Sequence, residues 1–306
     1  MPVQEAADEQ RGERRDTTTD LPRVLTAESR ASQSSRTELL RLMLLARSLE
    51  GRVLAIRNGA AAGHRRRARG RGSEALVGAA AVLGPEDRLF APDRYLSAHL
   101  ARGLPPETFL LRCLGSRGEA PEADAWTVGY ASPGTELIDM AAGAALALQL
   151  RGADGVAMAI VPGECYVTGH AAEALRAARP RKLPLVVVVE ASPTVELADR
   201  PDDEVDLSDV EAIGAAARKS VEDARHGDGP GLLLCAASRQ AAGGPLVNGA
   251  PIADPIEREL KRMAVNATTR ELLRPLRREV RAEVRDAMRR ARSLDAYWRR
   301  QGISTA

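Results

Sequence analysis

The stretch VAMAIVPGECYVTGHAAEAL, residues 156–175, contains the pattern that decides the fold. Its first six residues are continuously apolar, as in a β-strand that is buried on both faces. Pro162 and Gly163 then interrupt the run, and an alanine-rich segment that favours a helix follows Gly169. The stretch therefore predicts a buried strand, a glycine turn and a helix.

Two further apolar runs predict strands of the same kind, LPLVVVVE at residues 183–190 and GLLLCAA at residues 231–237. Segments with helical spacing separate the three runs, so consecutive strands must be joined by crossover connections. Continuous apolar strands that alternate with helices are typical of a parallel sheet covered on both faces. We therefore predict an α/β fold with a doubly wound, mainly parallel sheet and helices on both faces.

Three segments before the central strand predict helices. Leucines recur at helical spacing from Thr37, the segment 73–83 begins with Ser73 as a candidate cap, and the segment 135–150 is long and rich in small residues. Two charged helical segments, 254–265 and 272–298, follow the last strand, and Pro275 is expected to interrupt the second.

The composition of the chain divides it into three parts. Residues 1–35 mix charged residues with Ser and Thr and have almost no apolar spacing, so they predict a disordered tail. Residues 36–250 would form the α/β domain, and residues 251–306 a helical C-terminal extension of the same domain.

Charge and cysteine content exclude several classes of protein. The 306 residues include 44 Lys and Arg against 42 Asp and Glu, a net charge of +2 that predicts no general affinity for nucleic acid. The three cysteines form no CxxC pair, so neither a disulfide framework nor a structural zinc site is indicated. No apolar run is long enough to span a membrane, and we expect a cytoplasmic protein.

The turn at Gly163 and Gly169 is a candidate anion site. In a doubly wound sheet, ligands bind where strands end, because glycine turns expose backbone N–H groups and helix N-termini favour negative charge. Glu164, between these glycines, offers a carboxylate that a magnesium ion on a diphosphate would need. From these residues alone, a purely structural turn remains the alternative interpretation.

The order of several phrases resembles a known family. The phrases LLRLMLLARSLEGRVLAI, GSEALVGAAAVLGPEDRLFA, SPGTELIDMAAGAALALQLRGADGVAMAIV, GHAAEALRAARPRKLPLVVVVE and ADPIEREL are collinear with the thiamine diphosphate-dependent alpha subunit of 2-oxo acid dehydrogenase complexes, of the pyruvate and branched-chain type. The resemblance covers residues 37–292. It implies a thiamine diphosphate-binding fold, oxidative decarboxylation of a 2-oxo acid with acyl transfer to lipoyl, and thiamine diphosphate and magnesium as cofactors.

The family's cofactor motif is G-D-G or G-E-G, about 25 residues, and then N-N. Here GEC occupies residues 163–165, and the 25 residues 166–190 precede Ala191 and Ser192. The resemblance thus assigns metal binding to Glu164 and Ser192, and places Cys165 where its Cβ would crowd the diphosphate. A second, ungapped register puts Gly163 at the carboxylate position and removes that metal ligand.

Other family positions are kept only in part. The Tyr-Arg pair that grips the diphosphate maps to Asp93 and Arg94, and Ser132 in SPGTELI falls at a cofactor-binding position. The two active-site histidines map to Ala68 and near Gly243.

Three further positions and one segment bear on the site that the resemblance implies. His170, at the start of a predicted helix, is the remaining candidate for a catalytic group, and Gly163 and Gly169 would contact the cofactor. The acidic segment after Ser192 is shorter than the family's, which normally carries another strand and helix there.

Three hypotheses follow for the function. The first is an active or weakly active alpha subunit that works with a beta subunit, as a heterotetramer, and with a lipoyl acyltransferase core. The second is a pseudoenzyme that acts as a structural or regulatory interaction subunit, because losing two acid–base groups removes the proton transfers. The third is a polyanion-binding protein that uses the Arg-rich run of residues 65–71. The first two involve neither nucleic acid nor a membrane.

Overall fold

The computed structural model describes residues 36–60, 72–113, 127–128, 135–167, 169–191, 201–237, 246–247, 250–251, 253–263 and 269–300. A parallel sheet of six strands, in the order β2-β1-β3-β4-β6-β5, forms the centre of this part of the chain. The strands are β1 (Arg88–Phe90), β2 (Thr127–Val128), β3 (Ala157–Pro162), β4 (Leu185–Ala191), β5 (Asp203–Asp206) and β6 (Gly231–Ala236). The predicted doubly wound α/β class is confirmed.

The two central strands are buried at every position. All six residues of β3 and all seven of β4 are buried, as their continuous apolar sequences predicted. Their register pairs Ala157 with Leu185 and Pro162 with Glu190. All three predicted strands are present, shifted by one or two residues at their ends.

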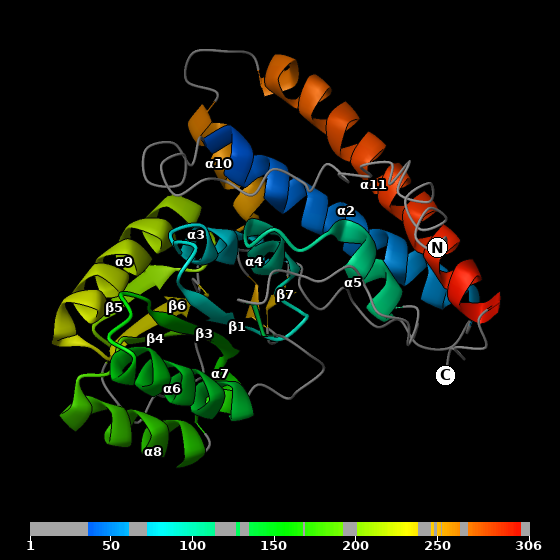
Figure 1. Ribbon diagram of the computed structural model, residues 1–306. Coiled ribbons are helices and arrows are strands. Elements are labelled where there is room, and N and C mark those ends of the chain that lie inside the picture. The colour runs from blue at the N-terminus through cyan, green and yellow to red at the C-terminus, as the bar shows by residue number, and fades with distance from the viewer. Residues whose placement is uncertain are drawn as a thin grey trace, which may run out of the picture.

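Helices cover both faces of this sheet (Figure 1). Side chains of one parity, such as Ile160 and Val188, pack into a large core with α2 (Arg36–Ala60), α3 (Val77–Ala80) and α9 (Val210–Asp223). Side chains of the other parity, such as Val161 and Val187, pack against α6 (Thr135–Leu150) and α8 (Gly169–Ala178). One face is therefore covered by many elements and the other mainly by two helices.

Further helices lie beyond the larger core. The C-terminal helix α11 packs along α2 and α5, and its apolar residues Val280 and Val284 join the same core as the sheet (Figure 1). The remaining described elements are η1 (Glu74–Leu76), α4 (Leu96–Ala101), α5 (Pro106–Cys113), α7 (Gly163–Tyr166), η2 (Arg179–Arg181), the π-helical turn η3 (Ala224–Asp228), the antiparallel pair β7 (Leu246–Val247) and β8 (Ala250–Pro251), α10 (Pro255–Met263) and α11 (Thr269–Arg300).

Two expectations about helices are wrong. Pro275 does not interrupt α11, because the helix continues through it to Arg300 and packing against α2 and α5 offsets the missing backbone hydrogen bond. Ser73 does not cap the helix that follows it, because its hydroxyl is directed to another partner described below.

The acidic segment after Ser192 does contain a strand and a helix. Edge strand β5 pairs with β6, and α9 follows, with Asp209 accepting the N–H of Ala212 at 3.1 Å as its cap. The shortness of this segment therefore does not remove the strand and helix that the family normally carries there. The strands β1, β2 and β5 were not predicted, because runs of two to four residues are too short to show a periodic pattern.

No helix in the described ranges is long and apolar enough to cross a membrane. The predicted disordered tail, residues 1–35, lies outside the described residues. The division into a domain 36–250 and a helical extension 251–306 stays a prediction.

Candidate functional site

The candidate site lies where the strand order reverses. Strand β1 is flanked by β2 and β3, so the chain leaves β1 toward one edge of the sheet and later returns on its other side. Such a switch point leaves a crevice at the carboxyl ends of the two strands. Arg94 follows β1 and Glu164 follows β3, and these two side chains meet at 3.3 Å, Nη1 to Oε1.

Glu190, at the carboxyl end of β4, is the centre of this site. Its side chain is fully buried and accepts three hydrogen bonds. Arg94 Nη2 donates to Oε2 at 2.6 Å, the Tyr95 hydroxyl donates to the same oxygen at 2.7 Å, and the Ser73 hydroxyl donates to Oε1. Side chains from two separate loops are therefore joined through one carboxylate.

Arg94 is held by several groups of the chain itself. Its guanidinium carbon lies 5.1 Å from the centroid of the Tyr95 ring, in cation–π contact. Burial alone would lower the pKa of Arg94, but the surrounding negative groups, including Glu190 and Glu164, raise it above its ordinary value. Arg94 is therefore a permanent cation whose charge is already opposed by two carboxylates.

Tyr95 is a hydrogen-bond donor in this network. Burial, and then the nearby Glu190 carboxylate, raise the pKa of Tyr95 well above its ordinary value. The phenol therefore keeps its proton and donates it to Glu190. Neither Tyr95 nor Ser73 was predicted as a site residue, although Tyr95 directly follows Arg94 in the sequence.

The residues of the predicted glycine turn form a short helix. Gly163, Glu164 and Cys165 lie in α7, which begins directly after β3, and no side chain caps its N-terminus. Glu164 is exposed, whereas Cys165 is buried, and burial followed by the Glu164 charge raises the pKa of the Cys165 thiol. The thiol therefore stays protonated and is not an activated nucleophile.

The predicted site residues are brought together only in part. Arg94 and Glu164 are in contact, and Gly163 and Cys165 flank Glu164 in α7. Gly169 and His170 begin α8, and the side chain of His170 lies outside the described residues. Ser132 and Ser192 also lie outside them, as do Ala68 and Gly243, so their predicted roles stay predictions.

The described residues do not make a magnesium site. No group of three or more His, Cys, Asp or Glu side chains in the described ranges could hold a metal ion. Of the predicted metal ligands only Glu164 is described, and its carboxylate faces Arg94. A single carboxylate beside a guanidinium cation does not supply the several oxygen ligands that magnesium requires.

A second buried carboxylate cluster adjoins the first. Glu74, next to Ser73, accepts Arg47 Nε at 2.7 Å and the N–H of Gly72 at 2.6 Å, and Arg47 also binds Asp254. Burial, and then the Glu74 charge, raise the pKa of Glu50 to about 8. Glu50, close to Glu74, is thus a group whose protonation changes near pH 8.

His99 supports the loop that carries Arg94. The ring is buried in α4, and its Nε2 lies 3.2 Å from the Pro92 carbonyl oxygen, two residues before Arg94. Burial lowers the pKa of His99, so the neutral ring donates to this carbonyl. His99 is thus a positioning residue for the loop.

Comparisons with known proteins find matches among solved structures. No family model matches the chain, and no curated protein matches it. Among solved structures, one similar chain is described as a candidate thiamin diphosphate-dependent enzyme isolated from Mycobacterium smegmatis, with 19% sequence identity and a TM-score of 0.35. The match covers 54% of this chain and spans 31% of the length of that chain.

Proposed function

We propose that the chain is an alpha-subunit-like protein of a 2-oxo acid dehydrogenase complex that acts as a structural or regulatory subunit, with weak or no catalysis of its own. The collinear phrases support the family, and the predicted α/β sheet agrees with it. Its partners would be a beta subunit and a lipoyl acyltransferase core.

One observation carries the proposal of weak or absent catalysis. Arg94, the cation expected to grip a diphosphate, is bound by the buried Glu190 at 2.6 Å and by Glu164 at 3.3 Å. A diphosphate would have to displace these carboxylates or share the cation with them. Among the described residues, two carboxylates beside one guanidinium give a net negative charge, which opposes an anionic ligand.

Thiamine diphosphate and magnesium do not fit the described donor set. The carboxylates are engaged with Arg94, the thiol of Cys165 stays protonated, and Ala191 has no polar side chain. We therefore derive no catalytic step through these groups. The chain would instead contribute its fold and its surfaces to an assembly.

A calorimetric titration of the chain with thiamine diphosphate and magnesium, with and without a beta subunit, tests this proposal. We expect no binding heat, no protection against thermal unfolding, and little or no decarboxylation of 2-oxo acids. Tight binding with turnover would contradict the proposal.

A motif-restoring variant is the matched control for this titration. The variant C165G/A191N/S192N returns the family residues to the three motif positions. Binding by the variant but not by the natural chain would show that the altered positions account for the loss. Association of the natural chain with the beta subunit would support its role in an assembly.

A further inference from the structure

The outer face of α6 carries an apolar stripe beside its exposed polar residues Glu136, Asp139 and Gln149. Met140, Gly143, Ala147 and Leu150 recur at intervals of three and four residues, so they form one stripe, and all four are exposed. Met140 is 46% exposed and Leu150 is 77% exposed. A contiguous apolar patch on the surface of a protein often marks a site of contact with another molecule.

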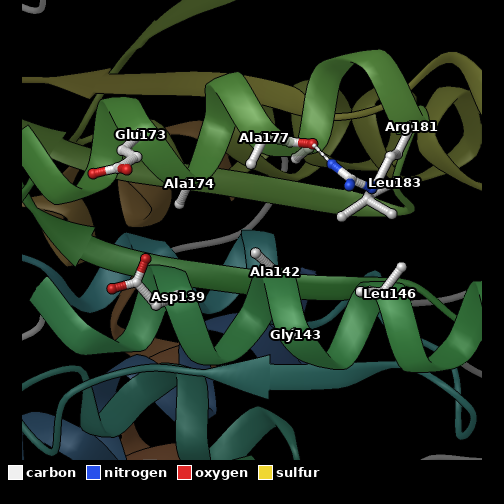
Figure 2. A pocket seen from close by; sticks show the side chains of 10 residues that line it. Asp139, Ala142, Gly143, Leu146, Glu173, Ala174, Ala177, Arg181 and Leu183 are labelled. Atoms are coloured by element: carbon white, nitrogen blue, oxygen red, sulfur yellow. Dashed lines mark hydrogen bonds between the residues drawn. The ribbon is translucent and has the colours of Figure 1, made fainter.

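A groove runs beside this stripe, between α6 and α8 (Figure 2). It encloses about 460 Å³. The small side chains of Ala142, Ala174 and Ala177 form much of its lining, together with Leu146 and Leu183. We call the stripe and the groove together the α6/α8 face.

Gly143, at the middle of the stripe, has no packing reason within the described chain. A glycine inside a helix costs about 1 kcal/mol relative to alanine. At Gly78 in α3 the cost has a visible cause, because a Cβ there would come within 2.4 Å of the Val210 carbonyl oxygen of α9. At Gly143 a Cβ would meet no atom within 4 Å. A helix from another molecule that crosses α6 as closely as α9 crosses α3 would supply the missing reason.

The charges on the α6/α8 face are divided between its two ends. Exposed Glu136, Asp139 and Glu173 lie in the N-terminal halves of α6 and α8, and exposed Arg151 and Arg181 lie beyond their C-terminal ends. Figure 2 shows Asp139 and Glu173 at one end of the groove and Arg181 at the other. Two copies of such a face attract each other when they pack antiparallel, because each acidic end then meets a basic end.

We propose that the α6/α8 face binds a second copy of this chain, with α6 packed antiparallel against its equivalent and crossing it near Gly143. In this arrangement Glu136, seven residues before Gly143, lies opposite Arg151 of the other copy, eight residues after it. The contact is isologous, so it closes as a dimer. It is independent of the proposed function, because it needs neither a cofactor nor a beta subunit.

The first test is sedimentation equilibrium of the full chain and of Gly143→Leu. The Cβ of this leucine would meet no atom of the described residues within 4 Å, so we expect the fold to be kept, but the larger side chain prevents the close crossing. We expect the natural chain to dimerise and the dissociation constant of Gly143→Leu to rise by about 10-fold or more. Gly51→Leu is the matched control, because Gly51 is also an exposed glycine within a helix and has no atom within 4 Å of an added Cβ.

A charge exchange tests the orientation. Glu136→Arg and Arg151→Glu each place like charges opposite each other and should weaken the dimer, whereas E136R/R151E should restore it. A natural chain that stays monomeric at high concentration overturns the proposal. A dimer whose dissociation constant is the same in Gly143→Leu also overturns it. The proposal is likewise overturned if hydroxyl-radical labelling of the α6/α8 face is reduced by a beta subunit but not by a second copy of the chain. Either result of the thiamine diphosphate titration would leave these dimerisation results unaffected.

Discussion

Two buried carboxylates lie at opposite ends of the same sheet. Asp87 precedes β1 at the amino end, Glu190 ends β4 at the carboxyl end, and both side chains are fully buried. Each is bound by an arginine, Arg225 for Asp87 and Arg94 for Glu190. Both therefore meet the requirement that a buried charge be paired and hydrogen-bonded.

The partners of the two carboxylates differ in kind. Asp87 accepts the backbone N–H groups of Gly84 and Val156, at 2.7 and 2.8 Å, in addition to Arg225. Among the described residues, the three partners that donate to Glu190 are all side chains. Backbone donors fix a turn permanently, whereas side-chain donors can change rotamer and bind a ligand. The comparison identifies Asp87 as a structural group and the Glu190 network as the adaptable site.

Asp87→Ala should have the largest effect on stability. The substitution removes the acceptor of the buried Val156 N–H and of the half-buried Gly84 N–H, and it removes the carboxylate that binds Arg225. We expect the free energy of unfolding to fall by about 3–5 kcal/mol, measured by urea denaturation. A loss below about 1 kcal/mol would contradict the structural role of Asp87.

Arg94→Ala should destabilise the chain less than Asp87→Ala. Glu190 keeps the hydroxyl donors Ser73 and Tyr95, and the Arg94 side chain is 22% exposed rather than fully buried. We expect a loss of about 2–3 kcal/mol in the same denaturation experiment. An effect as large as that of Asp87→Ala would remove the distinction between the two ends of the sheet.

Glu50→Gln tests the titrating group behind the site through its pH dependence. The folded-state pKa of Glu50 is raised from 4.5 to about 8, so the folded chain keeps this proton to higher pH than the unfolded chain does. This group therefore lowers the free energy of unfolding as the pH rises from 4.5 to about 8. We expect Glu50→Gln to flatten the fall in unfolding free energy between those values by on the order of 1 to 2 kcal/mol. A parallel pH profile for the two proteins would contradict the raised pKa.

Lys219→Ala should have the smallest effect. Lys219 binds Asp203 at 3.0 Å, but its side chain is 63% exposed, so solvent and salt screen the pair. We expect no measurable change in the denaturation midpoint. A clear fall in the midpoint would contradict the expectation that this exposed ion pair contributes little to stability.

The sequence predicted the elements whose pattern is long. The continuous apolar runs of β3, β4 and β6 identified the parallel sheet, and the leucine spacing of α2 identified its helix. Strands β1, β2 and β5 were missed because each is too short to show a periodic pattern. Their places in the sheet come from pairing with distant strands, which a local pattern does not contain.

The candidate site was predicted less completely than the fold. Arg94 and Glu164 were named, and the structure brings them into contact. Glu190 was counted only as the end of a strand, although a single carboxylate that closes an apolar run is a usable signal. Ser73 was interpreted as a helix cap, because its partner lies 117 residues away in sequence and only the fold brings them together.

The most direct test of the central claim is binding of inorganic pyrophosphate to the natural chain and to Glu190→Gln. The amide keeps the shape of the side chain and one of the two oxygens that accept from Ser73 and Tyr95, but it removes the charge that Arg94 opposes. We predict no calorimetric binding by the natural chain, measurable binding by Glu190→Gln, and loss of that binding in R94A/E190Q. Equal binding by the natural chain and Glu190→Gln would contradict the claim that Glu190 occupies the cation of this site.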